Sequence, residues 1–162
     1  AWEQQGGTIT TPSDAATIRI QLFNVMNSGW VAYDDVSLIE VGHSTNLAPN
    51  PGFEDTTGWS EVTRAGFPGT SFLRSSSGTA QPHDGSYAYA ISNHAYGYLR
   101  SDPITVSADT EYDLHAWVRG ELDPDDSYYN WIVRAYFYNS SGGYISYVNA
   151  ATGGAGSISP AW

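Results

Sequence analysis

Three stretches of this sequence alternate between two sets of residues, and in each stretch one set contains an arginine together with an aromatic residue. They are residues 17–23, 112–119 and 130–138. Residues two apart in an extended strand share a face, so each set would line one side of a strand. Aromatic rings stack on the apolar C–H faces of pyranoses, and planar polar groups hydrogen-bond the hydroxyls. The spacing therefore favours a sugar-binding surface.

The apolar set in each stretch is expected in the core: Ile18, Ile20, Leu22, Tyr112, Leu114, Ala116, Val118, Trp131, Val133, Ala135 and Phe137. We expect the opposite sets to share one non-core face as candidate ligand-binding residues: Arg19, Gln21, Phe23, His115, Trp117, Arg119, Arg134, Tyr136 and Tyr138. Three arginines there would also suit the carboxylates or sulfates of an acidic polysaccharide, because guanidinium forks match oxyanions. The alternative is that a neighbouring loop or domain packs on this face.

Catalytic motifs are absent from the sequence. Acid pairs such as those in 123–126 arise freely in a chain with 17 Asp and Glu residues, and this stretch is typical of a solvated loop. No Gly-x-Ser-x-Gly elbow or Gly-rich phosphate loop is present. The chain has no Cys, and its four His are scattered without zinc spacing. We therefore expect no enzyme activity.

The elements that position these residues are expected to be strands. The chain has 162 residues, 41% of them hydrophobic, which is enough for one domain with its own core. Its aromatic, Gly, Ser and Thr content favours strands and tight turns. Residues 17–23 and 30–38 are predicted to pair across a turn, and 130–138 to form a hairpin with 144–148. With no helical periodicity, the prediction is an all-β, two-sheet antiparallel sandwich or jelly roll.

The charge balance excludes two classes of partner. The net charge is −11, and all six basic residues are arginines. Binding nucleic acid or an anionic membrane surface requires basic clusters that displace counterions, so neither partner is expected. No apolar run approaches the roughly 18 residues that span a bilayer, so no membrane insertion is expected.

The order of the segments is unusual. Ala1-Trp2 recurs as Ala161-Trp162, and joining the two ends gives one continuous strand-rich passage. This pattern predicts a circular permutant or one period of a tandem repeat cut out of frame. Residues 1–40 would be the closing strands of a module, either this one or the preceding repeat. Residues 41–51 would be a connector, and 46–162 the opening and main body of the module.

Rearranged to begin near residue 44, nearly the whole chain resembles the β-jelly-roll carbohydrate-binding modules of the group that includes families four, nine and twenty-two, which are galactose-binding-like sandwiches. The matching segments are 46–54, 83–88, 112–119, 136–143, 11–20 and 29–38. Such modules normally begin at the Asn-Pro-Gly-Phe-Glu segment, which is 50–54 here. This chain therefore departs from the family in the order of its segments. The resemblance implies a glycan cleft on a concave face and an extracellular or cell-surface location.

The resemblance also implies a structural calcium site where the first and last segments of the module meet. Hard oxygen ligands suit Ca²⁺, and the chain offers the side chains of Glu54 and Asp35 there. Main-chain carbonyls near Gly52 and Ser86, and Asp84, would complete the site. The alternative is that Asp35 belongs to a solvated acid pair and that Glu54 is a surface acid.

Two functions from different classes follow. The first is a non-catalytic module that binds polysaccharide as one unit of a repeat array, with weak sites acting together through avidity. The second is a structural repeat of an extracellular filament. In that arrangement residues 1–40 would complete the preceding module by strand addition, giving head-to-tail self-association of identical or similar repeats.

Overall fold

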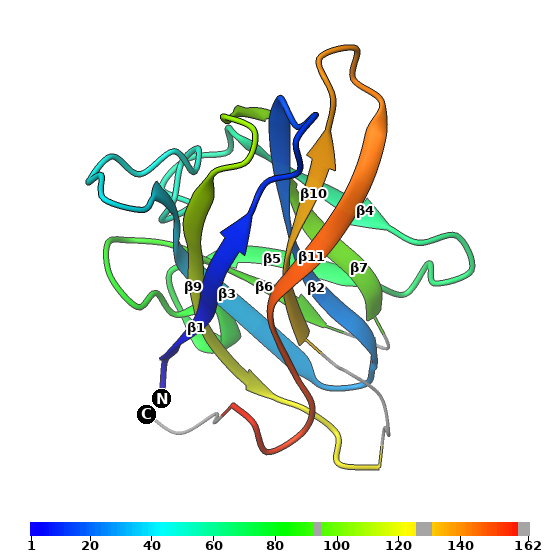
Figure 1. Ribbon diagram of the computed structural model, residues 1–162. Coiled ribbons are helices and arrows are strands. Elements are labelled where there is room, and N and C mark those ends of the chain that lie inside the picture. The colour runs from blue at the N-terminus through cyan, green and yellow to red at the C-terminus, as the bar shows by residue number, and fades with distance from the viewer. Residues whose placement is uncertain (93–94, 126–130, 159–162) are drawn as a thin grey trace.

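The computed structural model describes residues 1–92, 95–125 and 131–158 and is built almost entirely of antiparallel strands (Figure 1). The strands are β1 (Glu3–Thr10), β2 (Thr17–Asn27), β3 (Trp30–Glu40), β4 (Trp59–Thr63), β5 (Ser71–Ser75), β6 (Ala88–Ser92), β7 (Ala95–Ser101), β8 (Ile104–Thr105), β9 (Glu111–Glu121), β10 (Trp131–Tyr138) and β11 (Tyr144–Gly153). The described helical structure is one 3-10 turn, η1 (Gly78–Ala80).

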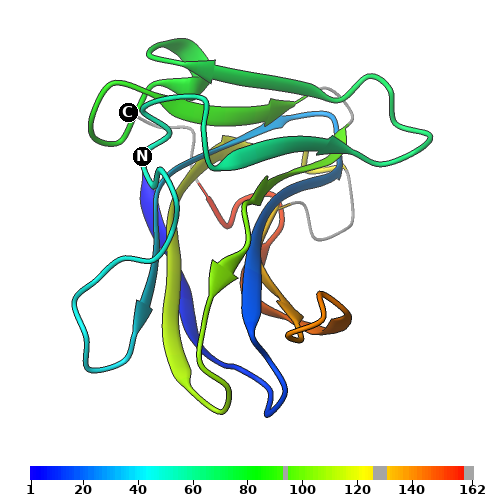
Figure 2. The same ribbon diagram turned by 90° about the horizontal axis from the view of Figure 1, so that it is seen from above.

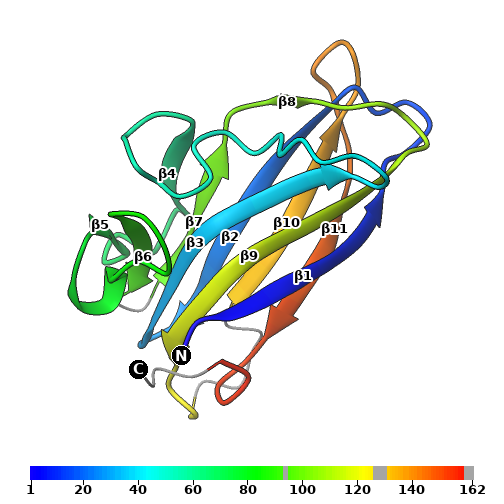
Figure 3. The ribbon, with the colours of Figure 1, turned by 90° about the vertical axis from the view of Figure 1, so that its left-hand side faces the viewer.

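The strands form two sheets. Sheet A has the order β1-β9-β3-β6-β5, and sheet B has the order β11-β10-β2-β7-β4, with β8 pairing to β2. The two sheets pack face to face: β1, β9 and β3 lie in front of β11, β10 and β2 in Figure 3, and Figure 2 shows the same layers from above. The all-β sandwich prediction is confirmed, and the arrangement is compatible with a jelly roll.

The core lies between the two sheets and is lined by the apolar sets that the alternation predicted. Every one of those eleven residues is buried. Tyr33 of β3 is also fully buried, and its hydroxyl donates a hydrogen bond of 2.5 Å to the Phe23 carbonyl of β2. This bond ties the middle of sheet A to the middle of sheet B.

The predicted pairing of residues 17–23 with 30–38 is wrong. These segments become β2 and β3, which lie in different sheets and are joined by the short turn at Ser28 and Gly29. Each strand buries one face, and that pattern is the same whether two strands pair edge to edge or pack face to face. The predicted hairpin of β10 with β11 does form, with Gly142 at a φ of 80° in its turn.

The first 40 residues supply three strands, two of them inside the sheets. β1 pairs with β9, β2 lies between β10 and β7, and β3 lies between β9 and β6. The segment 41–51 then runs back beside β3 through hydrogen bonds to its main chain. Leu38 N–H donates to Asn46 Oδ1 at 3.0 Å, Leu47 N–H donates to Leu38 O at 2.8 Å, and Val36 N–H donates to Pro51 O at 2.9 Å.

Candidate functional site

The nine predicted ligand-binding residues lie on two opposite faces of the sandwich. Strands β2 and β10 are neighbours in sheet B, whereas β9 belongs to sheet A. The expectation of one shared face is therefore wrong, because alternation shows which residues point away from the core but not which sheet a strand joins. Six of the candidates lie on the outer face of sheet B: Arg19, Gln21, Phe23, Arg134, Tyr136 and Tyr138.

The remaining three lie on β9 in sheet A, and a loop of the same chain covers two of them, Arg119 and Trp117. Arg119 is only 2% exposed, and its Nη2 donates to Gly78 O at 2.9 Å and Thr79 O at 3.3 Å. Its guanidinium lies 5.3 Å from the ring centroids of both Trp2 and Trp30. Burial lowers the pKa of Arg119. This arginine therefore anchors the η1 turn on sheet A instead of projecting into solvent.

The other two β9 candidates also have neighbours within the chain. The indole of Trp117 stacks on the imidazole of His83, with ring centroids 3.8 Å apart and an interplanar angle of 14°. His115 is half-buried and lies opposite Gly6 of β1, where an added Cβ would clash with it. The 78–83 segment packs over Trp117 and Arg119, so the alternative of a neighbouring loop on the predicted face applies to this part of β9.

The outer face of sheet B carries a band of stacked tyrosines. The Tyr136 ring lies 5.4 Å from that of Tyr147, at an interplanar angle of 29°, and 5.7 Å from that of Tyr144. Tyr138 meets Tyr144 edge-on at 6.2 Å. Tyr144 and Tyr147 are 56% and 49% exposed, so their rings are presented to solvent.

Sequence reasoning missed Tyr144 and Tyr147. They are three residues apart, which breaks the period-two pattern, because the β10–β11 register shifts between Phe137 and Tyr138. The bulge brings both tyrosines alongside β10, where Tyr147 pairs with Tyr136. A bulge of this kind leaves no reliable signal in the alternation.

Arg134 lies at the centre of the band. Its Nε donates to Asn149 Oδ1 at 2.7 Å and its Nη1 to the Tyr136 hydroxyl at 3.3 Å. The guanidinium lies 4.1 Å from the Tyr147 ring centroid and 5.0 Å from that of Phe23. Both neutral hydrogen-bond partners hold the side chain flat against the rings.

Two of the six sheet B candidates are covered by their neighbours. Phe23 points outward but is only 4% exposed, because it lies under Arg134 and under Tyr98, whose ring centroid is 4.6 Å away. Gln21 is also 4% exposed and lies between Arg134 and Arg100 in the strand register. The expectation that both are open contact residues is corrected: they form the floor of the face.

Arginine also lines the β2 and β7 side of this face. Arg100 is half-buried, and its Nε is enclosed without a hydrogen-bond partner among the described residues. Arg19 Nη1 donates to the Ser101 carbonyl at 3.5 Å. We call this surface the tyrosine–arginine face, and define it by Arg19, Gln21, Phe23, Tyr98, Arg100, Arg134, Tyr136, Tyr138, Tyr144 and Tyr147.

The residues predicted as calcium ligands come from three segments that meet at the bulge in the middle of β3. Glu54 Oε1 accepts hydrogen bonds from Ser86 N–H at 2.8 Å and Tyr87 N–H at 3.2 Å. A Cβ placed on Gly52 would lie 3.5 Å from Asp35 Oδ1 and 3.7 Å from Glu54 Oε1. Both carboxylates therefore face the same glycine. Asp84 accepts from Gly85 N–H at 2.8 Å, within its own loop.

The backbone is unusual at this meeting point. Asp35, Asn50 and Phe53 have φ values of 41°, 39° and 55°, a region that non-glycine residues rarely occupy. Asp35 lies in the bulge where β3 shifts register against β9. Such conformations persist only where the surrounding structure holds them, and they cluster at functional sites.

Asp34, which the sequence left outside the metal set, is fully buried beside the cluster. Its carboxylate accepts hydrogen bonds from the main-chain N–H groups of His83 at 2.7 Å, Asp35 at 2.8 Å and Asp84 at 3.4 Å. Burial raises the pKa of Asp34 to about 7, against these three donors. His83 Nδ1 also lies 2.7 Å from Asp35 Oδ2. Asp34 therefore fixes the 83–84 segment against β3.

The chemistry of this donor set fits an oxygen-ligated cation. Within residues 1–92, 95–125 and 131–158, no group of three His, Cys, Asp or Glu side chains gathers around one point. Asp35 and Glu54 supply only two carboxylates, so the remaining ligands would be main-chain carbonyls or water. Ca²⁺ accepts such a set, whereas zinc prefers nitrogen and sulfur.

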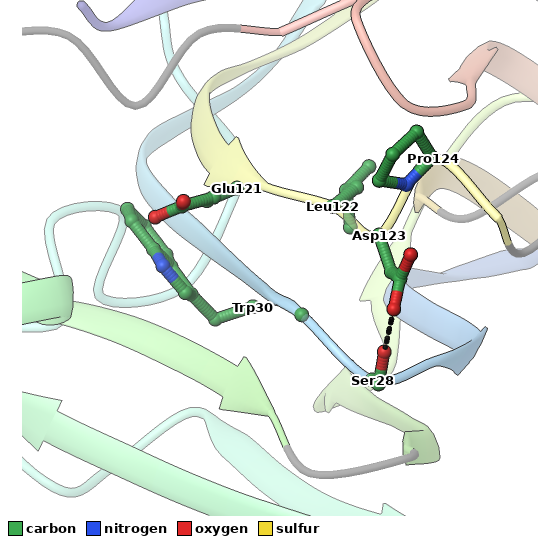
Figure 4. A pocket seen from close by; sticks show the side chains of 7 residues that line it. Ser28, Trp30, Glu121, Leu122, Asp123 and Pro124 are labelled. Carbon is green, nitrogen blue, oxygen red and sulfur yellow. Dashed lines mark hydrogen bonds between the residues drawn. The ribbon is translucent and has the colours of Figure 1, made fainter.

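A separate pocket of about 320 Å³ lies at the start of β3. Trp30 and Glu121 lie on one side of it, and the Ser28 hydroxyl donates to Asp123 Oδ2 at 2.7 Å on the other (Figure 4). The stretch 123–126 expected to be a solvated loop contributes Asp123 here, while Asp126 lies outside the described residues. None of the predicted ligand-binding or metal residues lines this pocket.

Comparisons with protein-family models, with curated proteins and with solved structures found no match. In the described part of the chain, no helix has the length and apolar character needed to cross a bilayer. The repeat of Ala1-Trp2 at positions 161–162 falls outside the described residues.

Proposed function

We propose that this chain is a non-catalytic carbohydrate-binding-type module that binds polysaccharide on the tyrosine–arginine face. The observation that carries the proposal is the stack of Tyr136 and Tyr147 with Arg134 between the rings and the covered Phe23. The two tyrosines of this face on β11 are also the most exposed large hydrophobic side chains in the described part of the chain.

The geometry suits an extended sugar chain. Neighbouring strands are about 4.8 Å apart, so the four strands from β11 to β7 present a surface roughly 15 Å wide. Tyrosine rings offer flat apolar area to pyranose C–H faces, and their hydroxyls remain available for hydrogen bonds. Because the side chains stand on strands and brace each other, little conformational entropy is lost when a ligand orders them.

The test is polysaccharide retention in affinity gels, with Tyr147→Ala and Tyr144→Ala as the variants. Both side chains are about half exposed, so truncation should leave the thermal midpoint unchanged while retention falls. Loss of one stacking ring should weaken binding by roughly 1 kcal/mol, or about fivefold. Leu73→Ala is the matched control, since Leu73 is 46% exposed on β5 of sheet A. Unchanged retention in both tyrosine variants would refute the proposed face.

We further propose Ca²⁺ as a structural ligand held by Asp35 and Glu54, with main-chain groups near Gly52 and Ser86 and with Asp84. The support is the convergence of two carboxylates on one glycine, and the left-handed backbone at Asp35, Asn50 and Phe53. A divalent cation there would neutralise the acids and join the 50–54 segment to β3. The extracellular or cell-surface setting implied by the family resemblance is part of the same proposal.

A structural role in a filament of repeats is the second candidate. It is favoured by the position of β2 and β3, because these two strands of the first 40 residues occupy inner places in the two sheets. The same strands supplied by a neighbouring copy would join modules head to tail. Light scattering tests this directly: regular polymers would support strand exchange, and a compact 17.5 kDa monomer would refute it.

A further inference from the structure

We infer that the tyrosine–arginine face selects anionic polysaccharides, those carrying carboxylate or sulfate groups, over neutral ones. The inference rests on the proposed function and concerns the same surface. It is carried by the distribution of charge among the strands. β11, β10, β2 and β7 contain no Asp or Glu, although the chain has 17 of them. The same four strands hold three of its six arginines, Arg19, Arg100 and Arg134.

The other sheet has the opposite character. β1, β3 and β9 of sheet A each carry acids, among them Glu3, Asp34, Asp113 and Glu121. A chain with a net charge of −11 therefore keeps these four strands of sheet B free of acidic side chains and places half of its arginines on them. The edge strand of sheet B, β4, carries Glu61, whose Oε1 accepts a hydrogen bond from the Tyr89 hydroxyl of sheet A. A surface of one sign raises the local concentration of ligands of the other sign.

The three arginines are also chemically available to an oxyanion. Among the residues that the structure describes, none of them is paired with a carboxylate. Arg134 is held by a neutral amide oxygen and a phenol, and Arg19 donates to a main-chain carbonyl. Guanidinium groups that lack a carboxylate partner form charge-assisted hydrogen bonds to ligand oxyanions.

The positions of the arginines match an extended ligand and not a single ion. Gln21 pairs with Arg134 on one side and with Arg100 on the other, so the two guanidinium groups flank β2 on the same face. Arg19 lies two residues along β2, opposite Tyr136. Charges spaced across three strands, with rings between them, suit a polymer whose acidic groups recur along a chain of sugars.

Nucleic acid is disfavoured as the occupant. Double-stranded DNA carries about one charge per 1.7 Å and is bound by proteins that neutralise many phosphates. Three arginines are few for that task, and the remainder of this chain is strongly acidic and would repel such a polymer. A polysaccharide with one charge per sugar approaches the face without comparable repulsion from the flanks.

The experiment compares matched probes on the full chain by titration calorimetry at low salt. Polygalacturonate is set against the same polymer fully methyl-esterified, and dextran sulfate against dextran, so that each pair differs in charge but not in backbone. We expect at least tenfold tighter binding of the charged member in one pair, and the pair that shows it identifies carboxylate or sulfate as the group recognised. Binding of that member should weaken steeply between about 50 and 500 mM salt, because the Debye length shortens roughly threefold over that range.

The variants Arg134→Gln and Arg100→Gln should each weaken binding of the charged polymer about tenfold, and Arg134→Lys should recover only part of it because the planar fork is lost. Arg74→Gln is the control. Arg74 lies on β5 of sheet A, with its guanidinium 3.7 Å from the Tyr87 ring centroid, so this variant removes the same charge and the same kind of ring contact from the other sheet. It should leave binding unchanged.

Four outcomes would overturn the inference. Equal affinity for the neutral and charged members, with the tyrosine variants still defective, would refute charge selection while leaving the proposed function intact. No binding of any polysaccharide would refute both. Equal affinity for single-stranded DNA would assign the face to polyanions in general. A self-associated species that dissociates on Arg100→Gln would assign the face to a second copy of the chain.

Discussion

Replacing Arg119 with methionine tests whether this residue holds the fold together or contacts a ligand, as its place in the alternation first indicated. Its Nη2 donates to the carbonyls of Gly78 and Thr79 at 2.9 and 3.3 Å, and its guanidinium lies 5.3 Å from two tryptophan rings. Methionine keeps the apolar stem of the side chain but removes the guanidinium, and with it the charge, the donors and the cation–π contacts.

The expected cost follows from those contacts. Hydrogen bonds from a charged donor contribute roughly 1.5–3 kcal/mol, and each cation–π contact about 0.5–1 kcal/mol. Removing a buried charge also relieves a desolvation cost, which offsets part of the loss. The net destabilisation is therefore about 2–4 kcal/mol. For a domain of this size, 1 kcal/mol shifts the thermal midpoint by about 2–4 °C, so a fall of roughly 4–16 °C is expected.

The assay is thermal unfolding followed by circular dichroism, with affinity-gel retention measured on the same samples. Arg64→Met is the control, because Arg64 lies over the Tyr96 ring at 4.4 Å but is exposed, so this variant loses a cation–π contact at little cost. Polysaccharide retention should be unchanged in both variants below their midpoints. An unchanged midpoint together with lost retention in Arg119→Met would show that Arg119 is a ligand contact and that the structural argument is wrong.

Two further predictions concern the cluster beside β3 and the link between the sheets. Saturating Ca²⁺ should raise the thermal midpoint of the wild type. Gly85→Ala should abolish that gain, because the added Cβ would clash with Glu54. Gly142→Ala is the control and should retain the gain, because the space around its Cβ is open. A wild type unaffected by chelation would refute the ion. Tyr33→Phe should lower the free energy of unfolding in urea by about 1–3 kcal/mol through loss of the bond to Phe23, and no change would contradict that bond's role.

Much of the fold was predictable from the sequence because alternation reports burial directly. Ile18, Leu114 and Val133 lie in the core where the period-two pattern placed them. The hairpin of β10 with β11 was predictable from its Gly-containing turn. These features depend on residues within one strand or on adjacent strands, so local pattern carries them.

The pattern failed where strands distant in sequence had to be matched. Alternation separated Trp117 from the core but did not place β9 in sheet A, while β2 and β10 joined sheet B. It also gave no sign that the 78–83 segment folds over Arg119, since that contact joins residues about forty positions apart. Loop burial of this kind depends on the path of the whole chain.

The sequence by itself determined that this protein is an all-β two-sheet sandwich, and it identified which side chains of β2, β9 and β10 enter the core. Composition and side-chain period are enough for that, because they decide which residues leave water. Only the tertiary structure decided that Tyr147 joins Tyr136 and Arg134 on one face, and that Asp35 and Glu54 meet at Gly52. Those juxtapositions depend on sheet order, a bulge and left-handed residues, which arise from long-range packing and leave no period in the chain.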